Sequence, residues 1–237
     1  MNRLIVLLLI SVLSFTGCDT LQNLPISTYP SSGTVSEAEA GQGIREALSQ
    51  GITSAILNLN KQNGFFGSEA YKLFLPEDAQ KIANTLRSLG LGVQVDKAIL
   101  QINRAAEDAV GYAKPVFVDA IKQMTITDAL NIVKGGSNSA TLYFKDKTRS
   151  RLIAAFTPSV KQSLDKVQAT KYYGDMVNTY NSFPTTFKKL NPDLTGYVVE
   201  RATDALFDQI AKEEAEIRAN PLARTTAILK KVFGGLK

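Results

Sequence analysis

Apolar residues recur at steps of three and four along most of this chain, and this spacing restricts the fold more than any other feature. In "IREALSQGITSAILNL" the recurring positions are Ile44, Leu48, Ile52, Ala55, Ile56 and Leu59. A period of 3.6 residues places them on one face of an α-helix, which has to be buried against a partner. The same pattern returns further on, so we predict an all-α fold, a single domain of about eight to ten helices.

Proline, glycine and capping residues indicate where these helices begin and end. The expected segments are Pro76 to the "GLG" at 90–92, Asp96 to Lys114, Pro115 to Met124, Thr127 to Val133, and helices that start at Ser139, Pro158, Thr195 and Asn220. Between the first two helices, "NGFFGSEAYKLFLP" breaks the helical period. Its second half, "YKLFLP", is predicted to be extended, the one small strand or hairpin element of the fold.

The N-terminus carries a targeting signal. Arg3 precedes "LIVLLLISVL", an apolar run that is well short of the roughly 20 residues that a membrane-spanning helix needs. A basic start, a short apolar run and small residues describe a secretory signal peptide. The "FTGC" that follows resembles a bacterial lipobox, in which the cysteine is acylated and becomes the new N-terminus; Phe15 departs from the usual leucine. We predict a lipoprotein signal peptide at 1–17 and lipidation of Cys18, over an ordinary secreted protein with a chance cysteine.

Residues 18–36 are then the lipidated cysteine and a flexible tether, rich in Ser, Thr and Pro, and residues 37–237 the helical domain. As a coil the tether reaches about 25 Å. Two or more acyl chains hold a protein stably on a membrane. We expect the bacterial cell envelope, with the periplasmic side of the outer membrane favoured over the inner membrane.

Composition excludes several kinds of chemistry. The chain has no histidine, and its single cysteine is Cys18, so imidazole-based triads, His-ligated metals and disulfides are not expected. The net charge of +5 is spread along the chain, which does not favour nucleic acid as a partner. We predict no cofactor, no metal and no catalytic residue.

Two helices place polar residues near their apolar faces. On the helix from Val198 to Ile217, the apolar positions span an arc of about 120° with Glu213 in its middle. Glu214 points outward there and can pair with Arg218 on the surface. On the helix from Asp96, Asn103 and Glu107 lie along the edge of an alanine-rich face, while Arg104 and Asp108 point away and can pair with each other.

These polar residues have a functional and a structural interpretation. In the functional one, Glu107, Glu213, Asp128, Asn103 and Arg149 line a pocket for a ligand or cation. In the structural one, Glu213 is buried against an arginine, such as Arg149 or Arg104, and fixes helix packing. We favour the structural interpretation.

Five phrases together resemble the bacterial family called domain of unknown function 4197: "GIREALSQGITSAI", "INRAAEDA", "AIKQMTITDALNIVKGG", "SATLYFKDKT" and "EEAEIRANPLARTT…LKKVFG". They run in order from about residue 43 to 233. The resemblance implies a helical envelope protein and supplies no catalytic residue.

The expected function is therefore a lipid-anchored envelope protein that acts as a non-catalytic binding or interaction module, with a protein or a small molecule as its partner besides the membrane. One alternative is a carboxylate-based enzyme or metal-binding protein with a pocket near Glu213 and Glu107. A second alternative is a structural accessory of an envelope assembly.

Overall fold

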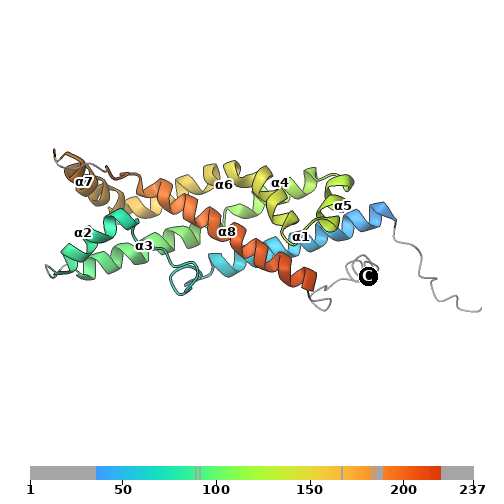
Figure 1. Cartoon of the computed structure of the whole chain (residues 1–237), viewed down its shortest axis with the longest axis horizontal. Helices are drawn as coiled ribbons and strands as arrows, with labels where there is room; N and C mark the ends of the chain where they lie inside the picture. The colour runs from blue at the N-terminus through green and yellow to red at the C-terminus, as the bar shows by residue number, and fades with distance from the viewer. Residues whose placement is uncertain are drawn as a thin grey trace, which may run out of the picture. The chain divides into compact units, whose positions relative to one another are not determined.

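The computed structural model describes residues 36–88, 90, 92–166, 168–182, 184 and 189–219, and this part of the chain contains eight α-helices and no strand (Figure 1). The helices are α1 (Glu37–Asn60), α2 (Glu77–Ser88), α3 (Gly92–Val110), α4 (Ala113–Gln123), α5 (Ile126–Lys134), α6 (Ser139–Lys166), α7 (Ala169–Ser182) and α8 (Leu194–Ala219). The all-α prediction is confirmed, with a helix count at the low end of the expected range. The predicted signal peptide, Cys18, the predicted tether before Ser36 and the helix predicted from Asn220 lie outside the described residues.

Helix α8 is the element around which the core is organised. It packs against α1, α3, α6 and α7, and Figure 1 shows it running along α6 and across α3 and α1. It is antiparallel to α6, since Glu214 contacts the first turn of α6 while Glu200 contacts Arg149 further along that helix. The largest fully buried side chains of this core include Phe117, Phe144, Phe156 and Leu206.

Helix α1 begins seven residues before the first apolar position of the pattern, Ile44. Its start is set by a capping box: the Ser36 hydroxyl accepts from the Glu39 N–H, and the Glu39 carboxylate accepts from the Ser36 N–H. This Ser-x-x-Glu signal was not among the predicted helix starts. Gly41 and Gly43 are buried in the added turns.

Helix α6 is continuous through Pro158, where two separate helices were expected. A proline in a helix interior removes the bond to the carbonyl four residues earlier. Here Pro158 and Ala154 are both exposed, so water can satisfy the freed carbonyl. The opposite face buries four side chains completely, and this burial holds the helix together: Leu152, Phe156, Val160 and Leu164.

The other helix limits differ from the predictions by smaller amounts. Thr125, rather than Thr127, caps α5, and its hydroxyl accepts from the Asp128 N–H. Pro115 lies in the first turn of α4, where no backbone donor is needed. Helix α7 was not predicted.

Candidate functional site

The loop between α1 and α2, residues 61–76, is held in place by buried polar side chains of α3. Asn103 is fully buried, and its side-chain amide binds both backbone groups of Leu73. Its Oδ1 accepts from the Leu73 N–H at 2.8 Å, and its Nδ2 donates to the Leu73 carbonyl at 2.8 Å. The strand predicted at 71–76 does not form, and at Leu73 an amide side chain satisfies the backbone groups that a neighbouring strand would bind.

Glu107 holds the first half of the same loop. Its side chain is 4% exposed, and Oε1 accepts from the backbone N–H groups of Phe65 and Phe66, each at 3.1 Å. Its Oε2 is bound by Arg104, which also donates to Oδ1 of Asn63 at 2.9 Å. Asn63 adopts a left-handed conformation with φ 66°, so this contact fixes the tightest point of the loop. The predicted Arg104–Asp108 pair is wrong: Arg104 pairs with Glu107.

Two tyrosines join the far side of the loop to α8. The Tyr71 hydroxyl donates to Asp208 at 2.7 Å and accepts from Lys212 at 2.7 Å. The Tyr197 hydroxyl donates to the Phe74 carbonyl at 3.0 Å. The hydrogen bonds from Lys212 and Tyr71 lower the pKa of Asp208, whereas burial is the main cause of the raised pKa of Tyr71.

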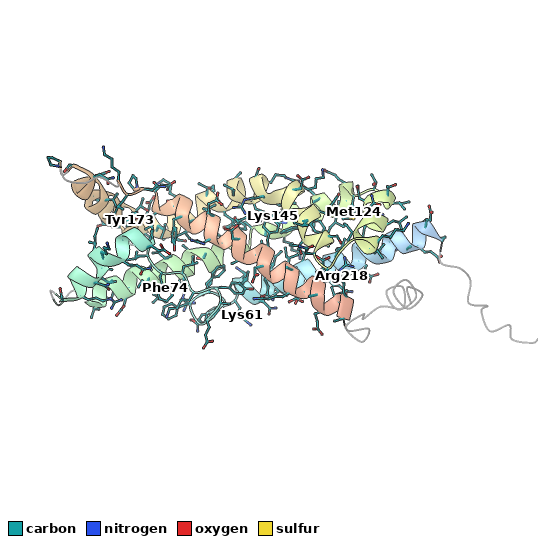
Figure 2. All side chains as sticks on the ribbon, in the orientation of Figure 1. Lys61, Phe74, Met124, Lys145, Tyr173 and Arg218 are labelled. Carbon is teal, nitrogen blue, oxygen red and sulfur yellow. The ribbon has the colours of Figure 1, made fainter. Side chains whose placement is uncertain are left out.

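A groove of about 730 Å³ lies between this loop and α8, and we call it the loop–α8 groove. It is open to solvent and continues, past Tyr197 and Arg201, into a second hollow of about 510 Å³ beside α7. Phe74, labelled in Figure 2, is 52% exposed. Two cations of the groove lie over aromatic rings: Lys72 over Phe74 at 5.7 Å and Arg201 over Tyr197 at 5.6 Å.

A second buried polar centre joins α8 to the start of α6. Glu214 is 7% exposed, and its carboxylate accepts from the Ala140 N–H at 3.0 Å, the Thr141 N–H at 2.9 Å and the Thr141 hydroxyl at 2.8 Å. A carboxylate is favoured there by the unpaired N–H groups and the dipole of a helix N-terminus. Arg218 pairs with Glu214 at 2.8 Å and also donates to the carbonyl of Ile132.

The expected orientations of Glu213 and Glu214 are therefore reversed. Glu213 is half-exposed and accepts from Asn58 and Gln209 rather than from an arginine. The Glu214–Arg218 pair exists as expected, but it is buried rather than on the surface. The buried stripe of α8 runs through Ala202, Leu206, Ile210 and Glu214. Each step of four residues turns about 400°, so this stripe drifts by about 40° per step away from a fixed arc.

The structure brings only two of the five predicted ligand-binding residues, Asn103 and Glu107, into one structural unit. Arg149 forms ion pairs with Glu200 and Asp204 on the surface of α8. Asp128 bonds to Thr125 at the start of α5, and these bonds lower the pKa of Asp128. None of the five lines the loop–α8 groove.

Among the described residues, no three carboxylates lie close enough together to hold a metal ion. Both Glu107 and Glu214 already accept hydrogen bonds on both oxygens. No described helix has the length and apolar character to cross a membrane.

Sequence reasoning missed the residues that form the loop–α8 groove. Tyr71 and Phe74 are near Tyr197 and Arg201 only in the folded chain, since more than 120 positions separate the Tyr197 hydroxyl from the Phe74 carbonyl that it binds. One signal was present. Residues 65–74 contain four aromatic residues in a segment that breaks the helical period. Four aromatic residues in a loop indicate a segment that packs against the rest of the fold or binds a partner.

Comparison with known proteins identifies a family for the chain. A family described as "Protein of unknown function (DUF4197)" matches residues 34–234. No curated protein and no solved structure gives a significant match.

Proposed function

This chain belongs to the DUF4197 family of unknown function, and from its residues and their geometry we propose that it is a lipid-anchored protein of the bacterial cell envelope that binds a partner protein through the loop–α8 groove. The groove is the single observation that supports the binding function. The N-terminal sequence supports the lipid anchor.

The anchor rests on Cys18 and the sequence around it. The cysteine follows a short apolar run and small residues, where lipoprotein signal peptides are cleaved. Two or three acyl chains on Cys18 hold the protein on the membrane, and one chain alone gives only marginal binding. As a flexible coil, the tether would separate the helical domain from the lipid by a typical distance of about 25 Å. We propose the periplasmic side of the outer membrane as its location.

The size and shape of the hollows favour a protein over a small molecule as the ligand. A small-molecule site has to enclose most of its ligand's surface. The more enclosed hollow, beside Glu214, has a volume of only about 40 Å³, which is room for a few water molecules. The loop–α8 groove is large but open, and an extended protein segment can lie along such a surface. Tyr, Phe and Arg side chains such as Tyr197, Phe74 and Arg201 dominate binding energy in protein interfaces.

The groove is also held ready for binding. Asn103 and Glu107 bind the backbone of its loop from α3. Hydrogen bonds of the Tyr71 and Tyr197 hydroxyl groups join the same loop to α8. A surface that is already ordered loses less conformational entropy when a partner binds.

The enzyme alternative has less support from the geometry. That alternative placed its pocket near Glu213 and Glu107, and neither residue lines the described hollows. Glu107 accepts hydrogen bonds on both oxygens and Glu213 accepts from Asn58 and Gln209, so both would have to give up hydrogen bonds before they could transfer a proton or hold a cation. The alternative of a structural accessory differs from our proposal in one respect, because it does not require an occupant for the groove.

The anchor is tested by metabolic labelling with a radioactive fatty acid. The wild-type protein should carry label and fractionate with membranes, while Cys18→Ala should lose both properties. Label that persists on Cys18→Ala contradicts the lipidation site.

The groove is tested by placing a photoreactive amino acid at Phe74 in cells. We expect a discrete adduct with one protein, which weakens when Arg201→Ala is added. The matched control is the same probe at Leu142, which is as exposed as Phe74 but lies on α6 outside the groove. Equal adducts from both positions, or none from Phe74, contradict the proposal and favour the structural accessory.

A further inference from the structure

Two cations of the loop–α8 groove have no carboxylate partner among the described residues. Lys72 belongs to the loop and Arg201 to α8, so they come from opposite walls of the groove. Lys72 lies over the Phe66 ring at 4.4 Å and over the Phe74 ring at 5.7 Å. Arg201 lies over the Tyr197 ring at 5.6 Å. An aromatic face attracts a cation but carries no net charge, so both side chains can still pair with an anion from outside.

The carboxylates that line the groove from α8 already have cation partners. Asp208 pairs with Lys212 at 2.9 Å, and Asp204 pairs with Arg149 at 2.7 Å. The one other acid whose side chain the structure describes along this groove, Glu77, is the first residue of α2. Its charge is partly compensated there by the positive end of the helix dipole. The charge that remains to attract a partner to this groove is therefore positive.

The charge changes sign in the neighbouring hollow beside α7. The charged residues that line this hollow, among those described, are Asp193, Glu200, Arg201 and Asp204. Glu200 and Asp204 share a single cation, Arg149. An acidic segment is therefore attracted to the part of the surface that the loop forms and repelled from the part beside α7.

Phe74 offers an apolar contact next to the two cations. Its ring is exposed, and it borders a further hollow of about 300 Å³ between the loop, α2 and α3. The apolar residues that line this hollow include Leu75, Ala83, Val95 and Ile99. A segment that follows the loop can place an apolar side chain beside Phe74 while its charged groups reach the cations. Interfaces of this kind gain most of their binding energy from a few such contacts.

On the basis of the function proposed above, we propose that the segment bound in the loop–α8 groove is acidic. Its carboxylates pair with Lys72 and Arg201, an apolar side chain packs beside Phe74, and the part that reaches the hollow beside α7 carries no acid. The net charge of +5 adds a long-range attraction for an acidic partner. An anionic lipid surface is the competing occupant. Lys72 is half-buried in the groove, however, where an extended segment makes closer contact than a flat surface.

Crosslinking in cells, with the photoreactive amino acid at Phe74 of the full-length protein, measures the contribution of each charge. Adding Lys72→Gln or Arg201→Gln should weaken the adduct by about two- to fivefold, as expected for loss of one exposed ion pair. Lys72→Arg and Arg201→Lys keep the charge and should retain most of the adduct. The matched control is Lys145→Gln, which should leave the adduct unchanged, because Lys145, labelled in Figure 2, is an exposed residue of α6 outside the groove.

The outcomes separate this proposal from the binding function itself. If the adduct forms but neither Lys72→Gln nor Arg201→Gln weakens it, the acidic segment is overturned and the protein-binding groove stands. If no adduct forms at Phe74, both are overturned. Both cations are at least half-exposed, so the fold should tolerate the changes, and circular dichroism checks this.

Mass spectrometry of the adduct identifies the partner residue that is attached to the probe. We expect Asp or Glu within a few positions of the attachment site. A segment that has no acid there, or that has Lys and Arg instead, overturns the proposal and leaves the binding function in place.

Phosphatidylglycerol vesicles test the lipid surface as the occupant. In the full chain carrying Cys18→Ala, Lys72→Gln and Arg201→Gln should bind these vesicles as Lys145→Gln does. If both variants bind the vesicles several-fold more weakly than Lys145→Gln, the two cations contact a membrane and the acidic segment is overturned.

Discussion

Replacing Asn103 of α3 by leucine should lower the free energy of unfolding of the domain, because Leu73 in the 61–76 loop loses both of its hydrogen bonds to the Asn103 side chain. Leucine has the same number and branching of side-chain heavy atoms as asparagine but cannot bind the Leu73 N–H and carbonyl, which stay buried. Each buried backbone group left without a partner costs about 1–3 kcal/mol. The added apolar side chain returns about 1–2 kcal/mol. At the middle of these ranges two such groups cost about 4 kcal/mol, so we expect a net loss of about 2–3 kcal/mol in the free energy of unfolding.

Urea unfolding followed by far-ultraviolet circular dichroism measures this loss directly, because the domain is helical. With an m-value near 2 kcal/mol/M, the midpoint should fall by about 1–2 M. The matched control is Asn131→Leu, an exposed asparagine of α5, which should change stability by less than about 0.5 kcal/mol. If both variants behave alike, the Asn103 amide does not hold the loop and the reasoning is refuted.

A local measurement separates the loop from the rest of the fold. In Asn103→Leu, trypsin should cut after Lys72 faster than in the wild type, because the loop opens more often. Cleavage after Lys145, an exposed residue of α6, should rise less than cleavage after Lys72, because it requires unfolding of the helix. An equal rise at both sites would mean that the loop opens only when the whole domain unfolds, and would contradict a local effect on the loop.

Two further predictions follow from the carboxylates of α8. Glu214→Ala removes the partner of the partly exposed Arg218 and three other hydrogen bonds to a buried carboxylate, so it should cost about 2–4 kcal/mol and lower the melting temperature by roughly 10 °C. Glu213→Ala should cost less than about 1 kcal/mol. Equal effects in thermal unfolding would refute the assignment of Glu214 as the buried residue. Because the pKa of Asp208 is below its usual 3.8, its contribution to stability should be complete above about pH 4 and disappear as the pH falls through the lowered pKa. The stability difference between wild type and Asp208→Asn, measured at a series of acidic pH values, should shrink in that range; a difference that grows instead would contradict the sign of the shift.

Helix periodicity predicted the core well where a helix packs with one constant face. The alanine-rich face predicted for the helix from Asp96 is the buried face of α3, where Ile102, Ala106 and Ala109 are fully buried. Asn103 and Glu107 were placed at its edge as polar groups that need partners, and both have them. The partners themselves are backbone groups of a loop 30 to 42 positions away, and no periodicity can indicate which ones.

The prediction failed where the buried face turns along a helix. For α8 a single averaged arc selected Glu213, while its buried stripe, drifting at four-residue steps, ends on Glu214. Which residues of α8 are buried at each point depends on the helices that it crosses there, and the sequence of α8 alone does not reveal those neighbours. The loop–α8 groove could not be predicted for the same reason, since it combines residues 70–77 with the first half of α8.

Because α3 holds the 61–76 loop through main-chain atoms, the backbone path of the loop does not depend on the side chains that the loop exposes. Asn103 and Glu107 bind main-chain atoms of Leu73, Phe65 and Phe66, which any residue other than proline provides. Outward side chains such as Lys72 and Phe74 can therefore be exchanged without altering the path of the chain. The exposed side chains of the loop can therefore differ between relatives, or be randomised in a library of engineered binders, while the hydrogen bonds from α3 keep the loop backbone in place.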